Sequence, residues 1–176
     1  MEIRYFNSNF DKITQNKDTD QNITNVIEKL PSLNIISDKN LLEETIKISN
    51  QFKEKKEKII VFGTGGSNLG ARALNNIISN NKIILEFYDN VDPINFEKNF
   101  QNINFELTGF LVISKSGTTP ETLSQFSCLY QKAIEANKVE DFFSNTLIIT
   151  EFKESPLYKI AKDNNCLLLE LSLIHI

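Results

Sequence analysis

The sequence predicts an α/β fold, a three-layer α/β/α sandwich built around a five-stranded parallel sheet. Short, nearly continuous apolar runs recur along the chain, which is typical of strands buried on both faces. Amphipathic helical stretches separate these runs, and strands that alternate with helices are joined by right-handed crossovers in a parallel sheet. The apolar runs lie at residues 59–62, 83–87, 110–113, 147–149 and 167–169.

Residues 1–40 precede this pattern and are rich in Asn, Asp, Thr and Lys. Hydrophobic periodicity is weak there, except in a short helical stretch near residues 22–30, which Pro31 closes. We interpret residues 1–40 as an N-terminal extension that is packed on the domain and partly irregular. The sequence then predicts one domain over residues 41–171 and an atypical terminal tail over residues 172–176.

The first clear helix of this domain is expected from residue 41 to residue 52. The charged run at residues 53–58 ends it, and we interpret that run as a solvated face and turn. Two later amphipathic helices are expected between the apolar runs, because side chains recur there at helical spacing. The positions that define the three helices are Leu41, Thr45, Ile48 and Phe52, widened by Leu42 and Ile46; then Leu69, Ala73 and Ile77; then Leu123, Phe126, Tyr130 and Ala133.

With 176 residues, 40% of them hydrophobic and 24% charged, the chain has the size and composition of one globular domain. The net charge of −4 argues against nucleic acid or an anionic membrane as the main partner. No apolar run reaches the roughly 18 residues of a spanning helix, and the first residues lack the basic and apolar regions of a secretory signal. We therefore expect a cytoplasmic protein in which Cys128 and Cys166 are free thiols.

Two polar loops rich in glycine and hydroxyl side chains each follow an apolar run and lead into a helix. The first covers residues 63–70 and the second covers residues 114–122. Free backbone N–H groups and the positive end of the helix dipole point outward at such a junction, which favours an anion. Because ligands of parallel sheets bind beyond the carboxyl ends of the strands, we expect the two loops to hold one phosphorylated ligand between two helix ends.

The first loop also partly matches two nucleotide-binding motifs. Gly63 and Gly65 fit the dinucleotide pattern G-x-G-x-x-G, but Asn68 occupies the third position, although Asp89 could imitate the acid that binds the ribose. The spacing of Gly65 and Gly70 fits a phosphate loop, but Ala and Arg follow instead of Lys and a hydroxyl residue. A glycine-rich turn without a ligand is a further alternative.

The second loop provides the stronger signal. It offers four hydroxyl groups where a helix cap needs only one, and its central Gly117 permits close approach of the backbone or an unusual φ. Pro120 suits the first helical turn, and the spacing of Thr118 and Glu121 is that of a capping box. The side chain of Lys115 could face a phosphate or reach solvent. The four hydroxyl groups belong to Ser114, Ser116, Thr118 and Thr119.

The motifs Gly-x-Gly-Gly-Ser-x-Leu-Gly at residues 63–70 and Ser-Lys-Ser-Gly-Thr-Thr-x-Glu-Thr at residues 114–122 resemble the two phosphosugar loops of the glucose-6-phosphate isomerase family. The resemblance covers roughly residues 40–171 and implies the first of that family's two sugar isomerase (SIS) domains, with a flavodoxin- or Rossmann-like sheet. It implies that Glu121 occupies the position of an acid that supports a catalytic histidine. The implied sugar-phosphate contacts are Gly65, Gly66, Ser67, Ser114, Lys115, Ser116, Gly117, Thr118 and Thr119.

The reaction that the resemblance implies interconverts glucose 6-phosphate and fructose 6-phosphate, in glycolysis and gluconeogenesis, through a cis-enediol. It implies no metal or organic cofactor, a hexose 6-phosphate as the ligand, and a homodimer when the protein is full length. The family's glutamate base, histidine, lysine and arginine follow a Gly-Gly-Arg-x-Ser segment that this sequence lacks, and its only histidine is His175. We therefore expect part of a longer isomerase, itself inactive. The alternatives are a non-catalytic SIS domain that binds a phosphosugar and a nucleotide-binding Rossmann-type domain.

Overall fold

The computed structural model describes residues 38–78 and 82–171. Apart from Asp38 and Lys39, this part of the chain belongs to one compact unit, Asn40–Ser172. The interpretations of residues 1–37 and 172–176, among them the helical stretch near residues 22–30 and the place of His175, lie outside the described residues.

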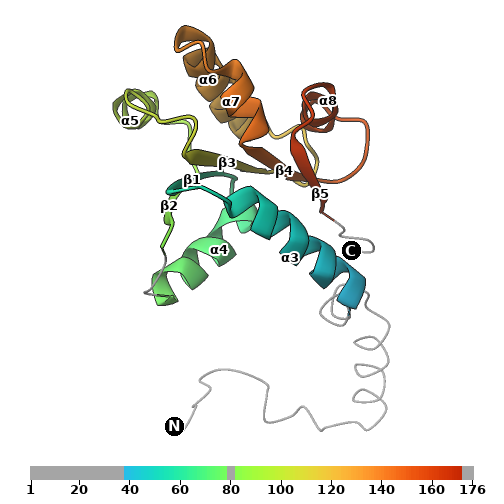
Figure 1. Ribbon diagram of the computed structural model, residues 1–176. Coiled ribbons are helices and arrows are strands. Elements are labelled where there is room, and N and C mark those ends of the chain that lie inside the picture. Colours follow the sequence, from blue (N-terminus) through green and yellow to red (C-terminus); the bar gives the residue numbers. More distant parts are fainter. Residues whose placement is uncertain (1–37, 79–81, 172–176) are drawn as a thin grey trace, which may run out of the picture. The chain divides into compact units, whose positions relative to one another are not determined.

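Five strands form one parallel sheet, as the sequence predicts (Figure 1). Their order is β2-β1-β3-β4-β5, and every neighbouring pair is parallel, so all five carboxyl ends lie at one edge. Each predicted apolar run coincides with a strand to within two residues at either end. The strands are β1 (Lys58–Phe62), β2 (Ile84–Tyr88), β3 (Thr108–Ile113), β4 (Thr146–Thr150) and β5 (Leu167–Glu170).

Helices lie on both faces of the sheet, which confirms the predicted three layers (Figure 1). On one face lie α3 (Lys39–Lys53) and α4 (Gly66–Ile77). The charged residues 54–57 form the turn that the sequence predicts after the first helix. The opposite face carries α5 (Pro93–Asn99), α6 (Pro120–Glu135), α7 (Val139–Ser144) and α8 (Pro156–Asp163).

The face under α5 to α8 holds the larger hydrophobic core and is rich in phenylalanine. Phe110 from β3 and Phe142 from α7 are both fully buried, with ring centroids 5.1 Å apart, and the ring of Phe126 on α6 lies 5.2 Å from that of Phe142. Each such aromatic pair contributes about 0.5–1.5 kcal/mol beyond the burial of area. This packing holds α6, the helix that follows the second polar loop, against β1 and β3.

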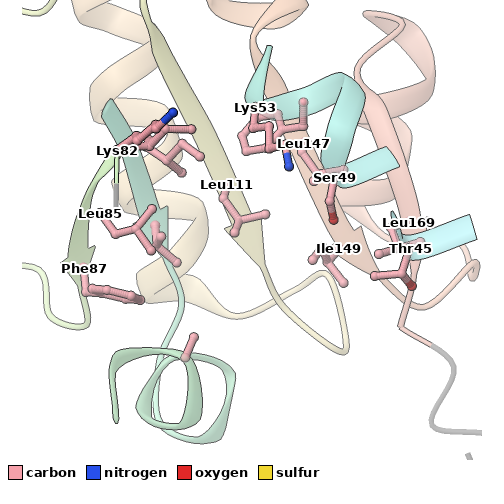
Figure 2. Close-up of a pocket in the computed structure, with 15 residues that line it drawn as sticks. Thr45, Ser49, Lys53, Lys82, Leu85, Phe87, Leu111, Leu147, Ile149 and Leu169 are labelled. Atoms are coloured by element: carbon pink, nitrogen blue, oxygen red, sulfur yellow. The ribbon is translucent and has the colours of Figure 1, made fainter. Parts of the chain in front are cut away.

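The face under α3 and α4 is less completely covered. A cavity of about 560 Å³ lies over it, and Figure 2 shows Leu85, Phe87 and Leu111 extending from the strands and Thr45 and Ser49 from α3. The predicted burial of the second strand on both faces is therefore wrong. That strand is β2, which lies at the edge of the sheet formed by the described residues.

The apolar stripe predicted for the helix after the first polar loop is also largely uncovered. Leu69 is 61% exposed and Ile77 is 76% exposed on α4, so the amphipathic pattern is real but does not pack on the sheet. Among the described residues, no helix has the length and apolar content needed to cross a bilayer.

The two cysteines are free thiols in different surroundings. Cys128 is exposed on α6, whereas burial raises the pKa of the Cys166 thiol to about 11. Because the thiolate is the reactive form, a thiol reagent at pH 8 should modify Cys128 at least about ten-fold faster than Cys166. Mass spectrometry of timed samples measures both rates, with Cys128→Ser and Cys166→Ser as single-thiol references. Equal rates in the folded protein would contradict this description of Cys166.

Candidate functional site

The two polar loops meet at a topological switch point of the sheet. From β1 the sheet extends to β2 on one side and to β3 on the other, and Phe62 at the end of β1 pairs with Val112 near the end of β3. A methyl group placed on Gly63 would lie 3.4 Å from the carbonyl oxygen of Ile113. The loops are therefore neighbours at the carboxyl edge of the sheet, where ligands of such folds bind, as the sequence predicts.

The first loop presents its backbone to solvent at the start of α4. Gly65 has φ of +56° and ψ of −125°, a conformation that favours glycine, and its carbonyl accepts from the N–H groups of Asn68 and Leu69, both at 3.1 Å. Within the described part of the chain, the Gly66 N–H has no acceptor, and a methyl group placed on Gly66 would meet nothing within 4 Å beyond its chain neighbours and the nearby backbone of α4. The helix thus begins with an exposed donor in an open space.

Asn68, which replaces the third glycine of the dinucleotide pattern, is buried and supports the first loop. It is 1% exposed, and its Nδ2 donates back to the carbonyl oxygen of Gly63 at 3.1 Å. Asp89, which could have imitated a ribose-binding acid, accepts from Nη1 of Arg72 on α4 at 3.1 Å. Both contacts weigh against a dinucleotide site.

The four hydroxyl groups of the second loop are arranged as two pairs. Ser114 Oγ lies 2.8 Å from Thr119 Oγ1 and accepts from the Gly117 N–H at 3.2 Å. Ser116 Oγ accepts from both the N–H and the hydroxyl of Thr118, at 3.2 and 3.0 Å. Ser114 is buried, whereas Ser116 and Thr118 are exposed. Because hydroxyl groups rotate, these pairs can redirect a donor toward a ligand without moving the backbone.

The predicted capping box between Thr118 and Glu121 is wrong, because α6 begins one residue later. Its N-cap residue is Thr119, whose hydroxyl is bonded to Ser114 and caps nothing, and Pro120 occupies the first turn as predicted. Consequently, among the described residues, the N–H groups of Glu121 and Thr122 find no acceptor. The hydroxyl groups therefore do not serve as helix caps, and the start of α6 keeps free donors.

Gly117 brings the second loop against the end of β4 and the start of α8. Its φ is +65°, and a methyl group there would lie 3.0 Å from Thr150 Oγ1 and overlap the hydroxyl of Ser155. The Gly117 carbonyl accepts from the Leu157 N–H at 3.2 Å. Thr150 and Ser155 were not predicted as parts of the site. Ser155 followed by proline is an N-cap signal that marks α8, but only the fold brings it to Gly117.

Lys115 offers the site a cation. Its side chain is exposed and forms no salt bridge among the described residues, while its carbonyl accepts from Thr150 Oγ1 at 3.3 Å and from the Glu151 N–H at 3.1 Å. A hydrogen bond from Lys153 lowers the pKa of Glu151, and the charge of Lys115 adds to this effect. The backbone of Lys115 is thus fixed, while its ammonium group is available to an anion.

The hydroxyl groups and backbone N–H groups of the two loops are suited to holding a phosphate. They are less suited to holding a metal ion. In residues 38–78 and 82–171, no group of three or more His, Cys, Asp and Glu side chains is placed to hold a metal ion. The predicted contact residues come from both loops, and Glu121 lies exposed in the first turn of α6. Backbone N–H groups, hydroxyl groups and an ammonium group together have the chemistry that suits an anion.

Comparison with known families gives one extensive match. A family model described as Phosphoglucose isomerase matches residues 15–168. A glucose-6-phosphate isomerase from Prochlorococcus marinus is 36% identical over 125 residues, which are 69% of this chain and 23% of that protein. One from Campylobacter jejuni is 32% identical over 124 residues, which are 68% of this chain and 29% of that protein. The matches thus span about a quarter of the length of these relatives.

Solved structures agree with the sequence comparison. The crystal structure of a glucose-6-phosphate isomerase from Chlamydia trachomatis superposes with a TM-score of 0.57 at 25% identity, over 65% of this chain and 23% of that one. A hypothetical protein from Thermus thermophilus gives a TM-score of 0.64 at 26% identity, over 75% of this chain and 33% of that one. The sugar isomerase domain of a transcription factor from Sphaerobacter thermophilus, at 19% identity and a TM-score of 0.52, shares the fold.

Proposed function

The chain belongs to the phosphoglucose isomerase family, and from this we propose that its two polar loops form the sugar-phosphate site of a glucose-6-phosphate isomerase. The single observation that carries the proposal is the meeting of both loops at the β1/β3 switch point, each with free donors at the start of its helix. The proposed contacts are Gly65, Gly66, Ser67, Ser114, Lys115, Ser116, Gly117, Thr118 and Thr119.

The chemistry of these residues supports a phosphate monoester as the group that is bound. The Gly66 N–H and the first N–H groups of α6 supply backbone donors, the paired hydroxyl groups supply adaptable donors, and Lys115 supplies charge. Hydrogen bonds to a charged acceptor contribute about 1.5–3 kcal/mol each, so a few of them suffice for a selective site. The hexose would then extend from the cradle toward Glu121.

The reaction in this proposal is the interconversion of glucose 6-phosphate and fructose 6-phosphate by transfer of a proton between C1 and C2 through an enediol. General acid–base catalysis needs a base within hydrogen-bond reach of that proton. We assign Glu121 a supporting role, in which its carboxylate orients a catalytic histidine outside this chain. A homodimer, action in glycolysis and gluconeogenesis, and a place in the cytoplasm belong to the same proposal and are supported by family membership.

Ligand choice tests the proposal directly. We expect the chain to bind fructose 6-phosphate and not fructose, because the cradle contacts the phosphate. Ser116→Ala and Thr119→Ala should each weaken that binding by about 0.5–3 kcal/mol, the range for one hydrogen bond. Isothermal titration calorimetry measures these affinities, with Ser127→Ala on the exposed surface of α6 as the control. Equal affinity for fructose and fructose 6-phosphate would refute the site.

A further inference from the structure

Gln125 is a buried polar residue that the proposed site does not use. It lies on α6 with 1% of its surface exposed, in the helix that begins at the second polar loop. Its Nε2 donates to the carbonyl oxygen of Asn90 at 2.8 Å and to that of Tyr88 at 3.3 Å. The two carbonyl acceptors fix the orientation of the amide, because the reversed orientation would place Oε1 against them. Gln125 therefore ties α6 to residues 88–90, which are the last residue of β2 and the two residues after it.

The same segment is also tied to the first polar loop and its helix. The Tyr88 carbonyl accepts from the Gly63 N–H at 3.4 Å, and the Asp89 carboxylate accepts from Arg72 of α4 at 3.1 Å. Residues 88–90 thus contact both polar-loop helices, α4 through Arg72 and α6 through Gln125. These helices lie on opposite faces of the sheet (Figure 1), so the connection runs around the sheet edge.

The ring of Tyr88 is packed in the core, 4.9 Å from that of Phe100 and 5.5 Å from that of Phe96. The two residues after it, Asp89 and Asn90, are exposed, so the side-chain contacts to Arg72 and Gln125 are what hold them. The hydrogen bond from Gln125 to the Asn90 carbonyl is partly buried, and a carbonyl that loses such a donor turns toward another partner or toward water. Loss of the Gln125 amide would therefore release Asn90 from α6 and leave the Tyr88 carbonyl with the Gly63 N–H.

We propose that Gln125 is a positioning residue that sets the distance between the two helix N-termini at the switch point, by holding residues 88–90 between α6 and α4. The inference rests on the proposed function, since the distance matters because one sugar phosphate is to contact both loops. The apparent affinity for a ligand that contacts two elements is proportional to the fraction of protein molecules in which both elements are correctly placed.

The experiment compares two side-chain amides near opposite ends of the strands, the buried Gln125 and the partly buried Asn145. Gln125→Met keeps the length of the side chain and removes the donor. Asn145→Leu is the matched control, because Asn145 Nδ2 donates to the Phe105 carbonyl at 2.7 Å just before β4, at the edge away from the loops. Both variants should unfold at lower urea concentration, but only Gln125→Met should weaken fructose 6-phosphate binding, by about five-fold or more.

Hydrogen exchange provides a readout that needs no ligand. In Gln125→Met, the amides of residues 63–70 and 114–119 should exchange faster than in the unaltered chain, while in Asn145→Leu they should not. If Gln125→Met does not fold, Arg72→Leu cuts the connection at the exposed ion pair and should accelerate exchange in residues 63–70.

The outcomes separate the two ideas. If the unaltered chain fails to bind fructose 6-phosphate, the proposed function fails, and the exchange comparison still decides whether Gln125 positions the loops. If the unaltered chain binds, and Gln125→Met matches Asn145→Leu in both affinity and exchange, the role of Gln125 is refuted while the proposed function stands.

Discussion

Gly117→Ala is expected to destabilise the protein by about 2–5 kcal/mol, from a left-handed backbone and an overpacked contact together. The φ of +65° at Gly117 disfavours any side chain, and the added methyl group would overlap the Ser155 hydroxyl and lie 2.8 Å from Ser155 Cβ. Relief requires the second loop to move away from α8, which displaces the hydroxyl pairs at the same time. Urea unfolding followed by circular dichroism measures the loss of stability.

The matched control for this substitution is Gly70→Ala. Gly70 lies inside α4, and no atom lies within 4 Å of a methyl group placed on it. Because alanine has the higher helix propensity, Gly70→Ala should leave stability unchanged or raise it by up to about 1 kcal/mol. Similar unfolding midpoints for Gly117→Ala and Gly70→Ala would show that the second loop is not held against α8 as described.

The sheet was predictable because its interior strands must be apolar on both faces. β1, β3 and β4 lie between other strands. Runs such as residues 59–62 and 147–149 therefore contain no polar residue that would interrupt the apolar pattern. The edge strand β2 reads the same way in sequence, and yet Ile84 is 61% exposed. The burial of a strand depends on which elements cover it, and a hydrophobic run in the sequence does not reveal those elements.

The short helices were harder to predict from periodicity. α5 and α7 have seven and six residues, too few turns to define an amphipathic stripe. Their ends carry better signals. Asp92 accepts from the Ile94 N–H before Pro93, and Ser155 accepts from the Tyr158 N–H before Pro156. A capping residue followed by proline marks a helix start, and that pattern could have revealed α5 and α8.

For the candidate site, the sequence identifies the loops but not their supports. Each loop is a contiguous segment, so its glycines and hydroxyl residues can be recognised directly in the sequence. Thr150 and Ser155 contact the second loop from β4 and from the start of α8, and Gln125 reaches residues 88–90 from α6, at sequence separations that only tertiary packing brings together. The capping box failed for a related reason, because Thr119 bonds to Ser114 and the helix start moved by one residue.

Residues 1–176 are expected to bind fructose 6-phosphate without converting it to glucose 6-phosphate. A phosphate cradle contacts the substrate and the transition state alike, so it cannot lower the chemical barrier by itself. The resemblance implies that the base, histidine, lysine and arginine follow a Gly-Gly-Arg-x-Ser segment, which these 176 residues do not contain. Glu121, the acidic side chain nearest the cradle in sequence, has the supporting role in our proposal.

A coupled assay decides this point by following the reduction of NADP⁺ by glucose-6-phosphate dehydrogenase. The Campylobacter jejuni glucose-6-phosphate isomerase serves as the positive control, and Glu121→Gln is the matched variant of this chain. We expect the chain and its variant to give the same background rate, while calorimetry under the same conditions shows binding by the unaltered chain. Steady conversion that Glu121→Gln abolishes would mean that Glu121 acts as the base and that the polypeptide carries out the reaction alone. If the chain gives only the background rate and still binds fructose 6-phosphate, the groups that transfer the proton lie outside these residues. The assay and the calorimetry together would then separate binding from the chemical step.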